Sequence, residues 1–180
     1  MTSATGKKLN PSLVSIRNQR LSHDRAFFRI LTEGEFEFFP NPPATLEMER
    51  EFLKKSEASR IAGTAYNFSI MLNEQVVGAV GLLIDGRHMH CGEIGYFVDR
   101  RYWGQGIASR AVELAEAFGV QELKLTRLEC MIATGNLASQ SVAHKNGYER
   151  EGLMKQKLKL GDNLHDAYLY AKIIEKSGDF

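Results

Sequence analysis

Six consecutive residues, Arg101-Tyr-Trp-Gly-Gln-Gly106, have the composition of a loop that binds a diphosphate. An apolar run precedes them at 94–98, and an amphipathic helical pattern begins at Ile107. At a strand-to-helix turn the first N–H groups of the helix point outward, and the aligned peptide dipoles favour a negative charge beside them. Glycines let phosphate oxygens approach the backbone, and Arg101 adds positive charge. The sequence therefore predicts a phosphate-bearing ligand at this turn.

Two common phosphate loops do not fit the surroundings of this turn. A dinucleotide-binding loop requires Gly-x-Gly-x-x-Gly after the first strand, whereas this motif follows several strand-like runs and has Ser109 at the third glycine position. A P-loop requires Gly-Lys-Ser/Thr, which does not occur in the sequence. A general nucleotide-binding α/β protein stays open as an alternative, and it would bind ATP or NAD tightly.

The elements around the loop form the pattern of one mixed α/β domain. Apolar alternation predicts strands, a 3.6-residue spacing predicts helices, and Asn73-Glu74, Asp85-Gly86 and Gly161-Asp162-Asn163 predict tight turns. Asn136 is expected to cap a short helix that ends near Gly147. The predicted strands are 13–16, 65–72, 75–84, 91–98, 127–134, 153–160 and 164–174, and the other helices are 23–32, 45–59 and one after Gly106 with Ile107, Ala111, Leu114, Ala115 and Phe118 on one face.

A second motif narrows the interpretation. It reads Asn136-x-x-Ser139-x-x-Val142-x-x-Lys145-x-Gly147-Tyr148 and follows the loop by about thirty residues. In this order the two motifs resemble those of the GNAT N-acetyltransferases. Together with Glu93-Ile-Gly-Tyr96 they resemble the subgroup of ribosomal-protein N-terminal (alanine/serine) acetyltransferases. The resemblance spans roughly residues 65–173.

The resemblance implies a fold and a cofactor. The fold would be a single α/β (α+β) GNAT-like domain, with a mixed, mostly antiparallel sheet of about seven strands, a splayed parallel central pair and about four helices. The cofactor would be acetyl-CoA, with its pyrophosphate on the Arg101–Gly106 loop and its pantetheine arm along 96–98. The expected coenzyme A contacts are Tyr96, Phe97, Val98, Arg101, Trp103, Gly104, Gln105, Gly106, Ile107, Ala108, Asn136, Ser139 and Lys145.

The catalytic side chains depart from the family pattern. Many members protonate the leaving sulfur with a tyrosine at the position of Ala143. The ribosomal-protein subgroup resembles this chain in having a serine at Ser139, and this resemblance implies Ser139 as the donor, directly or through water. The glutamate proposed as base in the subgroup corresponds to Leu158, which leaves Glu93 as the best substitute. His88 and His90, just upstream, offer imidazole groups as other candidate bases but are more simply turn or strand-edge residues. Glu93 and Ser139 are therefore the expected catalytic pair.

A weak base favours an acceptor of modest pKa. Freeing an α-amine at pH 7 costs on the order of 1 kcal/mol, whereas freeing a lysine amine costs about 4.6 kcal/mol. We therefore expect a protein or peptide N-terminus, or a small amine, as acceptor. Residues 33–51 contain six glutamates and several phenylalanines, which would suit a cationic amine or simply a core with a solvated face. A coenzyme A-binding regulatory module with little catalysis stays open as an alternative.

Composition sets the remaining expectations. The chain has 180 residues, a formal net charge of +1 and two separated cysteines, Cys91 and Cys130, without metal-type spacing. We expect one domain at 9–176, a flexible segment at 1–8, reduced cysteines and no metal site. The charge balance and the lack of a long apolar segment argue against nucleic-acid and membrane partners. The reduced cysteines and an N-terminus without a signal-peptide pattern favour a cytoplasmic protein, and the resemblance implies a monomer or homodimer.

Overall fold

The computed structural model describes residues 10–175, so the predicted flexible segment 1–8 and both predicted domain boundaries lie outside the described residues. None of the helices within this range is long and apolar enough to cross a membrane. The strands are β1 (Val14–Asn18), β2 (Ala65–Leu72), β3 (Gln75–Ile84), β4 (Cys91–Val98), β5 (Arg127–Ala133), β6 (Glu149–Leu160) and β7 (Asn163–Ile173). The α-helices are α1 (Asp24–Glu33), α2 (Leu46–Ile61), α3 (Ile107–Gln121) and α4 (Leu137–Lys145), and short 3₁₀ helices are η1 (Pro11–Leu13), η2 (Leu21–His23) and η3 (Arg100–Tyr102).

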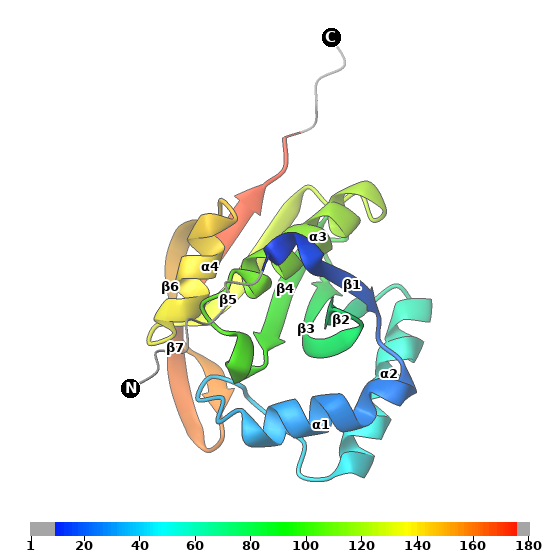
Figure 1. Ribbon diagram of the computed structural model, residues 1–180. Coiled ribbons are helices and arrows are strands. Elements are labelled where there is room, and N and C mark those ends of the chain that lie inside the picture. Colours follow the sequence, from blue (N-terminus) through cyan, green and yellow to red (C-terminus); the bar gives the residue numbers. More distant parts are fainter. Residues whose placement is uncertain (1–9, 176–180) are drawn as a thin grey trace.

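The seven strands form one mixed sheet in the order β1-β2-β3-β4-β5-β7-β6. Every neighbouring pair is antiparallel except β4 and β5, which are parallel in the middle of the sheet (Figure 1). This central pair is registered over only three rungs, from Cys91↔Arg127 to Glu93↔Glu129. The predicted architecture, with a splayed parallel pair and four α-helices in the described range, is confirmed.

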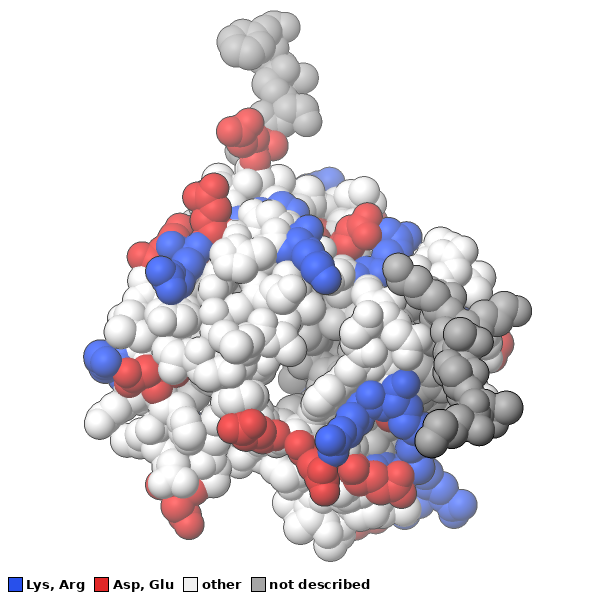
Figure 2. Space-filling model, turned by 60° about the vertical axis from the view of Figure 1, so that its left-hand side comes forward, with Lys and Arg blue, Asp and Glu red and all other residues white. Residues whose placement is uncertain are grey.

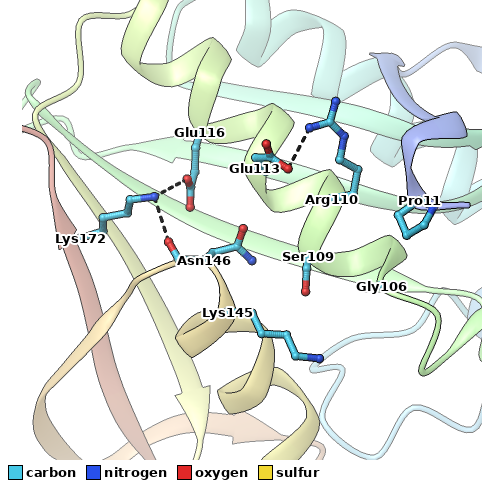
Figure 3. A pocket seen from close by; sticks show the side chains of 9 residues that line it. All are labelled: Pro11, Gly106, Ser109, Arg110, Glu113, Glu116, Lys145, Asn146 and Lys172. Carbon is cyan, nitrogen blue, oxygen red and sulfur yellow. Dashed lines mark hydrogen bonds and ion pairs between the residues drawn. The ribbon is translucent and has the colours of Figure 1, made fainter.

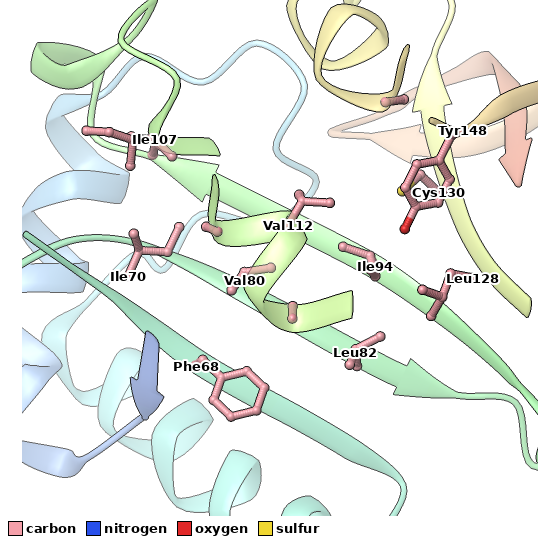
Figure 4. Close-up of a cluster of buried hydrophobic side chains, with 14 of the residues drawn as sticks. Phe68, Ile70, Val80, Leu82, Ile94, Ile107, Val112, Leu128, Cys130 and Tyr148 are labelled. Atoms are coloured by element: carbon pink, nitrogen blue, oxygen red, sulfur yellow. The ribbon is translucent and has the colours of Figure 1, made fainter. Parts of the chain in front are cut away.

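The helices cover the two faces of the sheet and separate two hydrophobic clusters. The larger cluster lies under α3 and α4, where Ile107 and Val112 of α3 pack on Ile70, Val80 and Ile94 of the strands (Figure 4). The smaller one lies on the opposite face, where Phe27 of α1 and Leu53 of α2 pack on Ala79, with Phe97 against them. Successive residues of a strand point to opposite faces, so β4 contributes to both clusters.

The predicted helix after Gly106 packs as its spacing indicated. Ile107, Ala111 and Ala115 are buried, and Leu114 and Phe118 are half-buried against the same cluster. Both cysteines are free, with Cys130 buried and Cys91 half-buried. Strand β4 therefore contributes side chains to the clusters on both faces of the sheet and lies beside β5, with which it pairs over only a short stretch.

The predicted start of the sixth strand was wrong. Strand β6 begins at Glu149, four residues before the predicted start, because it is an exposed edge strand whose pairing with β7 does not depend on an apolar pattern. Its ladder is also interrupted by register shifts at 150–152 and 154–158. The β3–β4 connection spans 85–90, as the predicted strands 75–84 and 91–98 require, and the Asp85 carboxylate accepts hydrogen bonds from the N–H groups of Arg87 and His88 there.

Candidate active site

The predicted diphosphate loop is held by a buried carboxylate. Asp99 follows β4 directly and is 4% exposed, and it accepts hydrogen bonds from the backbone N–H of Arg101 at 3.1 Å and from Arg29 of α1 at 3.1 Å. Burial would raise the pKa of Asp99, but these partners and the Arg101 side chain lower it below its ordinary value. A permanently charged aspartate therefore fixes the start of the loop to both β4 and α1.

The two loop glycines adopt a conformation that other residues avoid. Gly104 has φ +72° and Gly106 has φ +79°, in the left-handed region. A Cβ placed on Gly104 would meet open space among the described residues. Gly106 is the N-cap of α3 and, within residues 10–175, no side chain caps that helix. The first N–H groups of α3 are therefore free to bind an anion that approaches the loop.

A cleft of about 720 Å³ runs from this loop to the opening between β4 and β5. It exists because the two parallel strands separate after the rung Glu93↔Glu129. Figure 2 shows a hollow across one face of the molecule, with mostly uncharged side chains around it and charged side chains along its lower edge. From β4 and the loop, the lining residues are Tyr96, Phe97, Val98, Arg100, Tyr102, Trp103, Gly104, Gly106, Ile107, Ala108 and Ser109.

Helix α4 forms the facing wall of the cleft. The Asn136 Oδ1 atom accepts a hydrogen bond from the Ser139 N–H at 3.0 Å, which confirms the predicted cap and leaves the Asn136 amide N–H groups free to donate. Asn136, Ser139 and Lys145, which are predicted coenzyme A contacts, all line the cleft. Sequence reasoning missed Leu137, Ala138, Ser141 and Val142, although their helical spacing from Lys145 could have indicated them.

A segment that we call the aromatic strap, residues 34–39, closes one side of the cleft. Phe36 packs on Trp103 and on Phe97, with ring centroids 6.0 Å and 5.9 Å apart. Glu35 of the strap bonds Arg100 at 2.6 Å. A Cβ on Gly135 would lie 3.3 Å from Phe38 at the opposite rim. The strap thus spans from the loop to the start of α4, and Glu35, Phe36, Glu37, Phe38 and Phe39 all line the cleft.

Glu93 lies at the last rung shared by β4 and β5, on the face of β4 opposite Tyr96, and is not among the residues that line the cleft. It is half-buried, and none of the described residues forms a hydrogen bond or ion pair with its carboxylate. Burial, followed by the negative charge of Glu129, raises the pKa of Glu93, and Lys157 opposes this. Glu129 itself bonds Arg127 at 2.6 Å. Gly95, the next residue on the same face as Glu93, is exposed, and a Cβ there would meet open space among the described residues.

Several predicted residues lie away from the cleft. The Arg101 guanidinium bonds Asp99 at 2.6 Å, and Gln105 donates to the Arg101 carbonyl at 3.3 Å. His88 and His90 are exposed in the β3–β4 connection, where His88 bonds Asp85 at 2.9 Å. The positive side chains that line the cleft are Arg100 and Lys145.

A polar groove of about 410 Å³ continues from the cleft between α3 and α4 (Figure 3). Gly106, Ser109 and Lys145 line both spaces. Its floor holds Lys172, which bonds Glu116 at 2.8 Å and the Asn146 carbonyl at 2.9 Å. The loop, cleft and groove together offer backbone N–H groups at the start of α3, an opening between two strands, and Lys145 where the cleft meets the groove. These features fit the pyrophosphate and pantetheine parts of coenzyme A.

Comparisons with known proteins agree with this geometry. The acetyltransferase (GNAT) domain family matches residues 14–149. The N-acetyltransferase p20 of Bacillus licheniformis is 28% identical over 132 residues, which are 72% of this chain and 74% of the relative. The ribosomal-protein-serine acetyltransferase of Escherichia coli (strain K12) is 33% identical over 113 residues, or 63% of each chain.

Solved structures share the fold. RimL, a ribosomal L7/L12 alpha-N-protein acetyltransferase in complex with coenzyme A, has a TM-score of 0.85 at 24% identity, covering 91% of this chain and 95% of its own. Mycobacterium smegmatis RimJ, in complex with a CoA-disulfide, has a TM-score of 0.82 at 23% identity, covering 89% and 81%. Since the family match covers most of the sequence and the same fold carries the predicted coenzyme A loop, the chain belongs to the GNAT acetyltransferases, enzymes that use acetyl-CoA.

Proposed function

We propose that the protein acetylates an α-amine at a protein or peptide N-terminus, or a small amine, by direct attack on acetyl-CoA in a ternary complex. The observation that carries the proposal is the continuous cleft, which leads from the uncapped start of α3 into the opening between β4 and β5. Acetyl-CoA supplies the activated acetyl group, and the chain has to orient it, receive a proton from the amine and stabilise the departing thiolate.

The backbone of the loop would hold the pyrophosphate. Gly104 and Gly106 leave room for its oxygens, and Lys145 supplies a positive charge where the cleft meets the polar groove. Asn136 would donate its free amide N–H to the pantetheine from α4, while the backbone at 96–98 pairs with it from β4. Arg101 would act on the phosphates only through the loop conformation, because its side chain is bonded to Asp99.

Glu93 is the proposed base. Its raised pKa and unpartnered carboxylate suit a group that accepts a proton near neutral pH, and the open space over Gly95 gives an amine access along the same face of β4. A single carboxylate is a modest base. It is sufficient for an α-amine, whose deprotonation at pH 7 costs on the order of 1 kcal/mol.

Ser139 is the proposed source of a proton for the leaving sulfur, directly or through water. It lies in the first turn of α4 and lines the cleft. The family's usual tyrosine position holds Ala143, which is 3% exposed and packs in the core. The chain therefore needs another hydroxyl group on this side of the cleft.

The Escherichia coli relative is named a ribosomal-protein-serine acetyltransferase, and this name supports a protein as the acceptor. The aromatic strap would border it, with the exposed Glu37 facing a positively charged amine. Ala143 and Leu158 favour a second candidate, a coenzyme A-binding module with little catalysis. A thiol-release assay with acetyl-CoA and a library of N-terminal peptides separates the two, because the module would bind coenzyme A without releasing thiol. Faster turnover of lysine or polyamine acceptors than of any peptide N-terminus would contradict the proposed acceptor class.

The substitution Gly104→Val tests the loop. Valine strains the left-handed backbone by about 1–2 kcal/mol and places methyl groups where the phosphates would lie. We expect loss of coenzyme A binding, measured by calorimetry, with the fold retained. Gly161→Val is the matched control, since Gly161 also has a positive φ of +59° and open space around it, but lies in the β6–β7 turn. Equal coenzyme A affinity in both variants would refute the loop assignment.

A further inference from the structure

The side chain of Tyr96 crosses the opening in which the proposed function places the pantetheine arm. Tyr96 lies on β4, three residues past the last rung that β4 shares with β5. Its hydroxyl group donates a hydrogen bond to the backbone carbonyl of Ser139 in α4 at 3.4 Å. The side chain thus reaches from one wall of the cleft to the other, and Tyr96 and Ser139 both line the cleft.

The hydroxyl group is held loosely enough to change partner. A distance of 3.4 Å is long for a bond donated by a hydroxyl, and the Ser139 carbonyl belongs to an α-helix, where it has a backbone partner of its own. The ring, in contrast, is fixed, because it packs against the core cluster beneath α3 and α4. A ligand atom that enters the opening between the strands can therefore take the hydroxyl hydrogen bond without moving the ring.

We infer that the Tyr96 hydroxyl donates a hydrogen bond to the sulfur of the acyl donor and stabilises the thiolate as it leaves. This inference rests on the proposed function. The amine nitrogen forms the new bond to the acetyl carbon, and the carbon–sulfur bond breaks with its electron pair passing to sulfur. The amine gives one proton to the base, which passes it to water. After the thiolate has left, it takes one proton from Ser139, directly or through water, and the Ser139 hydroxyl regains its proton from water. Tyr96 keeps its own proton throughout.

The environment of Tyr96 is suited to such a role. Burial raises the pKa of Tyr96, and the hydrogen bond with Ser139 opposes this only in part, so the phenol stays protonated over the working pH range. A protonated phenol in a partly buried site is a strong hydrogen-bond donor to an anion. Tyr102, the other tyrosine of the cleft, lies in η3 beside the loop at the phosphate end. Tyr96 therefore lies at the end of the cleft where the proposed function places the sulfur. Ala143, which occupies the family's usual tyrosine position, supplies no hydroxyl group there.

The test is the titration of coenzyme A bound to the enzyme, followed by the ultraviolet absorbance of its thiolate, which needs no knowledge of the acceptor. In wild-type protein we expect the pKa of the bound thiol to lie below that of free coenzyme A. Tyr96→Phe keeps the ring and loses only the hydroxyl, and we expect it to raise the pKa of the bound thiol by about one unit. Affinity for coenzyme A that lacks its sulfur should be unchanged in this variant.

Two further variants serve as controls. One tests whether the removal of any tyrosine hydroxyl has the same effect, and the other tests whether the effect comes from Ser139. Tyr66→Phe is the matched control, because Tyr66 is another half-buried tyrosine packed against the same core cluster, on β2 beside Phe118. The pKa of the coenzyme A thiol bound to Tyr66→Phe should equal that of the thiol bound to wild-type protein. An unchanged thiol pKa in Tyr96→Phe would overturn the inference. A rise in Ser139→Ala together with that result would assign the hydrogen bond to the Ser139 hydroxyl instead. Failure of the wild-type protein to bind coenzyme A would instead overturn the proposed function.

If the wild-type enzyme turns over an acceptor peptide, Tyr96→Phe should lower kcat by about 10- to 100-fold, the loss expected for a hydrogen bond to a charged group. The KM for acetyl-CoA should stay close to that of wild-type, since the bond to sulfur strengthens only as the thiolate forms. An equal loss in kcat and in affinity for sulfur-free coenzyme A would show that Tyr96 only packs the cleft, and would refute the inference.

Discussion

Glu49 is a buried carboxylate whose ionisation should limit the stability of the fold above neutral pH. It lies in the first turn of α2 and is 4% exposed. Burial, followed by the negative charge of Asp24 in α1, raises the pKa of Glu49 to about 7. Asp24 stays ionised because Arg50 bonds it at 2.7 Å, and this hydrogen bond lowers the pKa of Asp24. At the contact between α1 and α2, the Asp24 carboxylate is therefore paired with Arg50, whereas the Glu49 carboxyl group has no ion-pair partner among the described residues.

The sign of the effect follows from linkage. In the unfolded chain Glu49 titrates at its ordinary pKa of 4.5, and in the folded protein at about 7, so the folded state holds an extra proton between these values. Wild-type stability, relative to a variant that cannot ionise here, falls as the pH rises from about 4.5 to about 7 and is level above that. Full conversion of the shift gives about 3 kcal/mol. We expect about 1–3 kcal/mol, because a rotamer change or an entering water relieves part of the buried charge.

The assay is urea unfolding of wild-type and Glu49→Gln at several pH values between 4 and 9, with the free energy of unfolding taken from the linear extrapolation. Glu49→Gln should match wild-type near pH 4 and exceed its stability by about 1–3 kcal/mol at pH 8. Glu47→Gln, an exposed glutamate in the same helical turn, is the control and should stay within about 0.5 kcal/mol at every pH. A pH-independent difference between wild-type and Glu49→Gln would refute the reasoning.

Two predictions concern the site directly. Glu93→Gln should lower kcat at pH 7 by about 100-fold or more and remove the acidic limb of the pH–rate profile. In wild-type this limb should lie above the ordinary glutamate range, because burial and Glu129 raise the pKa of Glu93. An unchanged acidic limb would assign the base elsewhere. Asp99→Asn should weaken coenzyme A binding about tenfold or more and destabilise the fold by about 1–3 kcal/mol, because Arg101 and Arg29 lose their buried carboxylate partner. Calorimetry and thermal unfolding measure the two effects, and wild-type values in both would contradict the role given to Asp99.

Local patterns were sufficient for the elements whose signals lie close together in the chain. The cap at Asn136, the apolar face of α3 and the glycines of the loop were all predicted, because each depends on the chemistry of a few neighbouring residues. The start of β6 was not, since an exposed edge strand is held by its ladder with β7 and carries little hydrophobic pattern.

Side-chain placement within the cleft depended on contacts between distant segments. The sequence placed Arg101 at the phosphates, but the buried Asp99 holds its guanidinium group. The sequence also left open whether the phenylalanines of 36–39 belong to the core or to the cleft. The ion pair of Glu35 with Arg100 and the contact of Phe38 with Gly135 place them at the rim of the cleft. The contacts of Glu35 and Phe38 join residues more than sixty positions apart, and no local pattern encodes them.

The sequence by itself determined the donor side of this protein, because a diphosphate loop is built from backbone N–H groups and glycines that six consecutive residues specify. Only the tertiary structure decided what surrounds the sulfur. The separation of β4 from β5 after Glu93↔Glu129, and the reach of Tyr96 to Ser139 across the opening, arise from strand pairing and helix packing between segments about forty residues apart.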